Sequence, residues 1–182
     1  MHSFSTGEMR PEKVLIPQNR LQERVSELGK EISQQFEGKD VAVVAILKGS
    51  FIFAADLLRA MTIPCSIDFM SISTYATQPD SGVVRITKDL DESIAGRDVL
   101  LVEDIIDTGL TVNYLLKTLT QRKPASLRVC TLLDKSARRL IDLPTFYRGF
   151  EIPDVFVVGY GMDYQQQFRN LPYIATLRLN GS

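Results

Sequence analysis

The sequence predicts an α/β protein in which a mainly parallel, twisted sheet is flanked by helices. Predominantly apolar runs at 41–47, 97–104 and 127–133 are typical of strands buried on both faces. Segments with helical periodicity, at 18–36 and 111–122, alternate with these runs along the chain. Because alternating strands and helices favour parallel strands joined by crossover helices, the order of the elements predicts the fold class.

Taken in order, the first predicted element is a helix at 18–36, which Gly38 ends. Its apolar side chains recur at helical spacing and form one stripe, which consists of Leu21, Val25, Leu28 and Ile32. The strand at 41–47 follows, and the segment 50–61 is a second helix. The sequence thus predicts one helix before and one helix after its first buried strand.

The middle of the chain predicts a hairpin around a long polar loop. We expect a strand with one solvent-exposed face at 65–73 and a loop at 74–82. A strand at 83–87 is expected to pair with 65–73. The remaining predicted elements are the strand 97–104, the helix 111–122 with Pro124 beyond its end, and the strands 127–133, 155–160 and 173–179.

The bulk composition predicts one domain, spanning 1–182, that binds neither nucleic acid nor a membrane. Hydrophobic residues make up 45% and charged residues 24% of the chain, which are ordinary values for a globular protein. The net charge is −1 and the pI about 5.9, so the basic face of a nucleic-acid binder is not expected. No apolar run approaches the ~18 residues of a membrane span, and residues 1–13 lack the apolar core of a secretory signal. We therefore expect a cytoplasmic protein.

The cysteine and histidine content narrows the chemistry. Cys65 and Cys130 lie in separate strand-like runs and are interpreted as small buried core residues in a reducing compartment. His2 is the only histidine and lies at the N-terminus. Its position excludes Ser-His-Asp and Cys-His catalysis and His-ligated zinc, so acid–base chemistry falls to Asp, Glu, Lys or Tyr.

Polar clusters follow several predicted strands. They are 48–50, 103–111, 134–135 and 159–163. Because ligands bind at the carboxyl ends of the strands in open α/β sheets, we expect these clusters to form the site.

The cluster 103–111 combines a phosphate-binding turn with two acids. Backbone N–H groups at the start of the following helix, with Gly109 permitting close approach, would hold a phosphate. The plainer interpretation is a capped helix start, with Asp107 or Thr108 at the N-cap. Glu103 and Asp104 would repel a phosphate unless a ribose or a divalent cation lay between them. The residues alone therefore predict a binder of ribose phosphate.

The stretch VLLVEDIIDTGLT, at 99–111, resembles the phosphoribosyl-pyrophosphate signature of the type I phosphoribosyltransferases. Four further segments resemble the bacterial hypoxanthine-guanine branch: VAILKGSFIFAADL, STY, LLDK with the Arg-Arg pair after it, and GFEIPDVFVVGYGMDYQQQFRNLPYI. The resemblance runs from about residue 14 to about residue 179. It implies the type I phosphoribosyltransferase fold, with a core at about 36–165, a small hood of N- and C-terminal segments, and a mobile lid loop at about 74–82.

The resemblance implies that the enzyme joins hypoxanthine or guanine to phosphoribosyl pyrophosphate and releases pyrophosphate, with Mg²⁺ as cofactor. Asp107 would be the general base that takes the proton of the purine. Glu103 and Asp104 would hold the ribose hydroxyls directly or through metal, and Asp163 would be a further metal ligand. Relatives are homodimers or homotetramers, which is the assembly that we expect.

The resemblance also assigns the two ends of the ligand. Lys48, Gly49 and Arg169 would bind pyrophosphate. The turn around Asp107 would bind the 5′-phosphate through Thr108, Gly109, Leu110 and Thr111; the Leu110 side chain can point away.

The implied purine pocket consists of Lys135, Phe156, Val157 and Asp163. A lysine ammonium donates to a carbonyl but accepts nothing from an amino group, so Lys135 would favour a 6-oxopurine over adenine. From the sequence alone, Phe156 is a core aromatic; by the resemblance it stacks on the purine. Thr74 and Tyr75 would begin the lid, which excludes water when it closes.

Three alternatives remain open at this point. A close relative could prefer xanthine, and a non-catalytic regulator on the same fold could sense phosphoribosyl pyrophosphate and bind nucleic acid. The near-neutral charge argues against the regulator. The D-T-G triplet also occurs in aspartic proteases, but those enzymes are all-β, whereas this chain alternates strand and helix.

Overall fold

The computed structural model describes residues 10–76, 82–143 and 146–177, in which two sheets are arranged side by side. The larger sheet has the strand order β4-β3-β2-β5-β6-β7. The elements, with their bounds, are β1 (Pro11–Ile16), α1 (Gln18–Gln35), β2 (Val41–Leu47), α2 (Phe51–Ala60), β3 (Cys65–Ala76), β4 (Gly82–Lys88), β5 (Asp98–Ile106), α3 (Leu110–Thr120), β6 (Ser126–Asp134), the 3-10 helix η1 (Ser136–Arg138), β7 (Phe146–Glu151), β8 (Val157–Val158) and β9 (Ile174–Leu177).

The larger sheet is parallel except at one edge, which confirms the predicted fold class. Five strands run parallel to one another, in the order β3, β2, β5, β6 and β7. Only β4 is antiparallel, and it forms the predicted hairpin with β3. This mixed α/β architecture rules out the all-β aspartic protease alternative.

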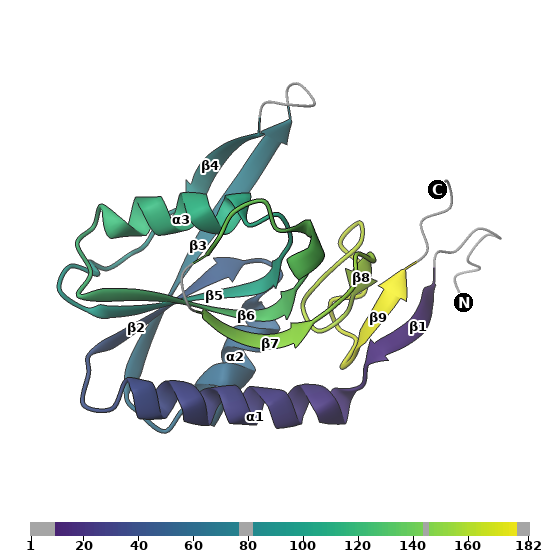
Figure 1. The fold of residues 1–182 in the computed structure, drawn as a ribbon, viewed down its shortest axis with the longest axis horizontal. Coiled ribbons are helices and arrows are strands. Elements are labelled where there is room, and N and C mark those ends of the chain that lie inside the picture. The colour runs from purple at the N-terminus through teal and green to yellow at the C-terminus, as the bar shows by residue number, and fades with distance from the viewer. Residues whose placement is uncertain (1–9, 77–81, 144–145, 178–182) are drawn as a thin grey trace, which may run out of the picture.

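Helices cover both faces of the larger sheet, with α1 and α2 on one side and α3 on the other (Figure 1). Strand β2 shows why its sequence is apolar throughout. Val41 and Val43 pack in the cluster that includes α1 and α2, whereas Ala42 and Val44 pack in the cluster that includes α3. Since successive side chains of a strand point to opposite faces, both sets must be apolar.

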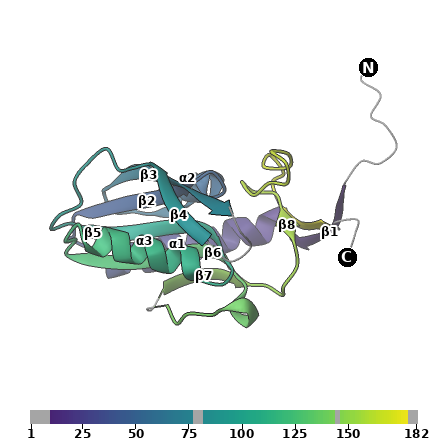
Figure 2. The same ribbon diagram turned by 90° about the horizontal axis from the view of Figure 1, so that it is seen from above.

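The second sheet is antiparallel, has the order β1-β9-β8, and lies beyond one end of the larger sheet (Figures 1 and 2). It differs from the prediction in two ways. The strand expected at 155–160 is only two residues long and does not join the larger sheet, and β1 was not predicted. Strand β7, at the edge of the larger sheet, was also missed.

Two further expectations need correction. The loop expected at 74–82 is shorter, because β3 continues to Ala76 and β4 begins at Gly82, and residues 77–81 lie outside the described part of the chain. Cys130 is buried as predicted, but Cys65 is only partly buried. In the described residues, no helix has the length and apolarity required to cross a membrane.

The strand order indicates where in the fold the candidate site lies. The chain leaves β2 for β3 on one side of the sheet and leaves β5 for β6 on the other, although β2 and β5 are neighbours. Ligands of open α/β sheets bind where the strand order reverses in this way, at the carboxyl ends of the strands. Lys48 and Gly49 follow β2 there, and Glu103 and Asp104 lie near the end of β5.

Candidate active site

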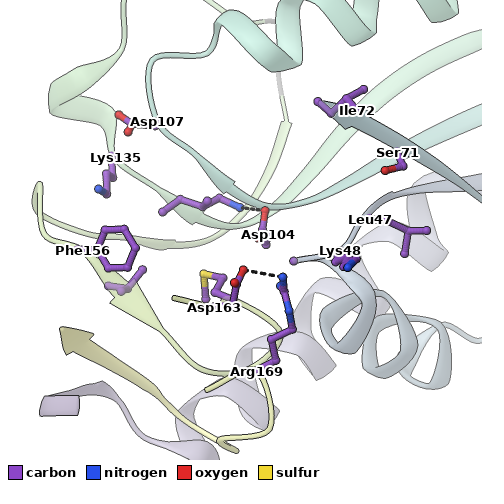
Figure 3. Close-up of a pocket in the computed structure, with 14 residues that line it drawn as sticks. Leu47, Lys48, Ser71, Ile72, Asp104, Asp107, Lys135, Phe156, Asp163 and Arg169 are labelled. Atoms are coloured by element: carbon purple, nitrogen blue, oxygen red, sulfur yellow. Dashed lines mark hydrogen bonds and ion pairs between the residues drawn. The ribbon is translucent and has the colours of Figure 1, made fainter. Parts of the chain in front are cut away.

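Two adjoining cavities occupy the carboxyl ends of β2 and β5 (Figure 3). The larger has a volume of about 460 Å³ and the smaller about 270 Å³. They share Gly49, Asp104 and Asp107 in their walls. Predicted site residues in the wall of the larger cavity are Lys48, Gly49, Asp104, Asp107, Lys135, Phe156, Val157, Asp163 and Arg169. Those in the wall of the smaller cavity are Gly49, Glu103, Asp104, Asp107, Thr108, Gly109 and Thr111.

Charged and aromatic side chains line the larger cavity from opposite sides. Figure 3 shows Lys135, Asp107 and Phe156 on one side and Lys48 on the other, with Asp104 between them. The sheet, the turn after β2 and the segment after β8 thus supply different walls.

The acidic pair lies in the floor of the site. Glu103 is 6% exposed, and burial, followed by the charge of neighbouring Asp104, raises its pKa well above the ordinary value. Burial also raises the pKa of Asp104, whose Oδ1 accepts a hydrogen bond from the backbone N–H of Ile105 at 2.8 Å. Glu103 is held away from water and Asp104 is partly exposed to the cavities, so two adjacent carboxylates here are costly unless a ligand or a cation compensates them.

Glu103→Gln should therefore stabilise the ligand-free protein. Because the pKa of this acid is raised in the folded state, its ionisation makes folding less favourable as the pH rises above the unfolded value of about 4.3. The melting temperature at pH 7.5 should rise by about 2–4 °C for each kcal/mol removed, and the gain should shrink toward pH 4. Glu37→Gln, at an exposed position, is the matched control. A Glu103→Gln melting temperature at or below that of the control would contradict the expectation.

Backbone geometry brings the turn after β2 against Asp104. A Cβ atom built on Gly49 would lie 1.6 Å from Asp104 Oδ2, so only glycine fits between the turn and the carboxylate. The preceding Leu47–Lys48 peptide bond is cis. The close approach to Asp104 Oδ2 places the backbone of Gly49 directly beside this carboxylate.

The turn predicted to bind phosphate lies at the start of α3, but its capping differs from the plainer interpretation. The N-cap residue is Gly109, with φ +85°, which has no side chain to cap the helix, and the Thr108 hydroxyl accepts a long hydrogen bond from the backbone N–H of Leu110 at 3.4 Å. Asp107 and Thr108 therefore precede the cap, and the N-cap expectation was wrong. Leu110 is 53% exposed, and the described residues that line the two cavities do not include it, so its side chain points away from the site.

Ion pairs hold the other polar side chains of the larger cavity. Arg169 Nη2 lies 2.6 Å from Asp163 Oδ1, and Arg169 Nη1 donates to the Gly161 carbonyl at 2.7 Å (Figure 3). On the opposite wall, Lys135 Nζ lies 3.2 Å from Asp154 Oδ1. These contacts fix the direction of two long cationic side chains at the edge of the cavity.

Phe156 is 40% exposed and borders the larger cavity, so the interpretation of this residue as a core aromatic was wrong. Its ring packs edge-on against Tyr164, with 5.7 Å between the ring centroids. The neighbouring Val157 is buried and begins β8.

Some expected contributions fall outside these walls. Thr74 and Tyr75 lie at the end of β3, and their side chains lie outside the described part of the structure. Among the described residues, no group of three or more His, Cys, Asp and Glu side chains forms a metal cage.

Sequence reasoning missed two charged residues of the site. Arg138, at the end of η1, and Asp154, between β7 and β8, contact Asp107 and Lys135 respectively. Arg138 belongs to the Arg-Arg pair that carries part of the family resemblance, which was its only signal. Asp154 likewise lies in a segment that carries the resemblance, GFEIPDVFVVGYGMDYQQQFRNLPYI, but no pattern of residues there predicts its contact with Lys135.

Comparisons with known proteins identify relatives of this chain. The family described as phosphoribosyl transferase domain matches residues 17–165. The chain is 48% identical to a hypoxanthine-guanine phosphoribosyltransferase of Mycobacterium avium, over 90% of this chain and 84% of that protein. It is 46% identical to a hypoxanthine phosphoribosyltransferase of Salmonella typhimurium, over 92% and 96% respectively. The crystal structure of a hypoxanthine-guanine phosphoribosyltransferase from Bacillus anthracis superposes with a TM-score of 0.87 at 46% identity, covering 94% of this chain and all of that chain.

Proposed function

The chain belongs to the phosphoribosyl transferase family, and we propose that it is a purine-salvage enzyme that converts hypoxanthine and guanine to IMP and GMP. Phosphoribosyl pyrophosphate is the donor and pyrophosphate the leaving group. The observation that carries the proposal is the meeting of Lys135, Asp107 and the Gly49–Asp104 floor in one cavity. This arrangement matches a 6-oxopurine at one end and a ribose with two phosphate groups at the other.

Lys135 and Asp107 recognise and activate the purine. The Lys135 ammonium donates a hydrogen bond to the 6-carbonyl, a contact that the amino group of adenine cannot replace. Asp107 accepts the ring N–H proton as the purine nitrogen attacks the anomeric carbon, the role of a general base. Phe156 stacks on the base, the backbone of Val157 borders its edge, and Asp163 completes the pocket.

The pyrophosphate end is held by cations and backbone donors. Lys48 and the backbone of Gly49 bind the leaving group from the turn after β2, and Arg169 binds it from the segment after β8. The 5′-phosphate sits on the N–H groups at the start of α3, with the Thr108 and Thr111 hydroxyls as donors. Glu103 and Asp104 accept hydrogen bonds from the ribose hydroxyls.

Mg²⁺ is the cofactor in this proposal, and the acidic residues fit it. Mg²⁺ usually binds through one or two carboxylates together with substrate phosphates, rather than in a cage made only of protein groups. Glu103, Asp104 and Asp163 would supply the carboxylate oxygens, and the cation would offset the burial and, after it, the repulsion from Asp104 that raise the pKa of Glu103. When bound, the metal would neutralise charge on the departing pyrophosphate.

Two larger features complete the proposal. The second sheet serves as the hood, which is supported by the contribution of Phe156 and Val157 to the cavity wall. The segment that begins at Thr74 and Tyr75 serves as the lid. We further propose a cytoplasmic homodimer or homotetramer; the free thiols of Cys65 and Cys130 fit a reducing compartment.

A spectrophotometric screen of five nucleobases with phosphoribosyl pyrophosphate and Mg²⁺ tests the function. Hypoxanthine and guanine should react, and adenine and the pyrimidines should not. With excess EDTA turnover should fall, and added Mg²⁺ should restore it. A preference for xanthine would establish the close-relative alternative, and binding of phosphoribosyl pyrophosphate without turnover of any base would overturn the enzymatic proposal.

A further inference from the structure

Arg138 and Asp154 connect the two side chains that face the purine. Arg138 Nε lies 2.9 Å from Asp107 Oδ1. The Nη1 atom of the same guanidinium lies 3.2 Å from both carboxylate oxygens of Asp154. Asp154 Oδ1 in turn lies 3.2 Å from Lys135 Nζ. The four residues thus form a charge chain, Lys135–Asp154–Arg138–Asp107, in which positive and negative groups alternate.

The charge chain consists of one largely buried side chain and three half-exposed side chains. The Lys135 side chain is 10% exposed, whereas Asp107, Arg138 and Asp154 are exposed to between 43% and 50%. The Arg138 guanidinium, and after it Lys135, lower the pKa of Asp154, so this carboxylate stays charged at neutral pH. Exposed single pairs contribute little to stability, so a stabilising role does not account for the arrangement.

The guanidinium suits its place between two carboxylates. It is planar and rigid and presents several donors, so it can contact Asp107 through one nitrogen and Asp154 through another. A lysine at 138 would offer a single point of charge on a flexible stem and could not span both partners in the same way. The geometry therefore uses a property that is specific to arginine.

We propose that Arg138 and Asp154 are positioning residues that set the separation between the Lys135 ammonium and the Asp107 carboxylate. The inference rests on the proposed function, because that separation must match a purine edge. In a 6-oxopurine the carbonyl oxygen and the N7 atom lie side by side on one edge. Lys135 addresses the oxygen and Asp107 the adjacent N–H, so both contacts form together only when the two side chains are correctly spaced.

The test compares the steady-state kinetics of Arg138→Ala, Asp154→Ala and the double variant. Misplacing a reacting group by 1 Å can cost about 10²-fold, so Arg138→Ala should lower kcat/KM for hypoxanthine by about 10- to 100-fold, mainly through kcat. Asp154→Ala should also raise KM for hypoxanthine, because Lys135 loses its anchor. The double variant should have a kcat/KM no lower than that of the more impaired single variant, since both changes break the same charge chain. KM for phosphoribosyl pyrophosphate should not change, and Arg138→Lys should recover part of the loss.

Arg122→Ala is the matched control, because Arg122 forms a surface pair with Asp89 at 2.7 Å, outside both cavities. Its kinetics should equal those of the unmodified enzyme. Unchanged kinetics in Arg138→Ala, or strictly additive losses in the double variant, would overturn the proposal. A parallel rise in KM for phosphoribosyl pyrophosphate would overturn it as well, because it would indicate general damage. Failure of the proposed function looks different, since the unmodified protein would then make no nucleotide.

Discussion

Asp107→Asn should lower kcat for hypoxanthine by about 10²- to 10⁴-fold, the usual contribution of a positioned acid–base group. Asparagine has nearly the same shape as aspartate, but its amide cannot accept the purine proton. The phosphate cradle at the start of α3 consists largely of backbone N–H groups, so phosphoribosyl pyrophosphate should still bind with the affinity of the unmodified enzyme. Turnover at saturating substrates and equilibrium binding of the donor measure the two quantities separately.

The control for this change is Asp91→Asn. Asp91 is a 77% exposed carboxylate that pairs with Lys88 and lies outside the two cavities of the site. It should leave both quantities unchanged. Near-normal turnover of Asp107→Asn would remove the general-base role from this residue. A loss of donor binding equal to the loss of turnover would instead assign Asp107 to the cradle.

Gly49→Ala should lower kcat/KM for phosphoribosyl pyrophosphate by about 10²-fold or more, because displacement of a reacting group by 1 Å is enough for an effect of that size. The new Cβ would lie 1.6 Å from Asp104 Oδ2, so either the turn after β2 or the carboxylate must move. Both belong to the proposed pyrophosphate and ribose sites. The kinetics should be measured with the donor as the varied substrate.

Gly38→Ala separates the effect of the clash from the effect of replacing a glycine. Gly38 has φ +73° and nothing within 4 Å of an added Cβ. Its replacement should cost about 1–2 kcal/mol of stability because of the left-handed backbone, with unchanged kinetics. Equal kinetics for Gly49→Ala and Gly38→Ala would show that the close approach of Gly49 to Asp104 has no part in turnover.

The apolar pattern predicted the interior of the fold better than its edges. Strand β2 was predicted because both faces are buried, which forces every side chain at 41–47 to be apolar. Strands β1 and β7 were missed because they lie at sheet edges, where exposed positions interrupt the pattern. The apolar run at 155–160 predicted a strand, but only the two residues of β8 are paired in the structure.

The candidate site, too, was predicted only in part from the sequence. The acids and the phosphate-binding turn lie in one contiguous motif, from which the chemistry of a ribose phosphate follows. The roles of Lys48, Lys135 and Arg169 came only from the family resemblance, because single cations carry no pattern of their own. Arg138 and Asp154 are defined by contacts between residues 16 positions apart, which only the folded structure brings together.

Buried Glu103 and its partly exposed neighbour Asp104, near the end of β5, have a consequence for the lifetime of the protein. A ligand that binds only the folded form adds about 2.7 kcal/mol of stability when present at a hundred times its dissociation constant. Since Glu103 and Asp104 make the empty site unfavourable, the substrate-free enzyme is the form most exposed to unfolding and proteolysis. Cells that run short of phosphoribosyl donor would then lose this enzyme faster than cells that are well supplied.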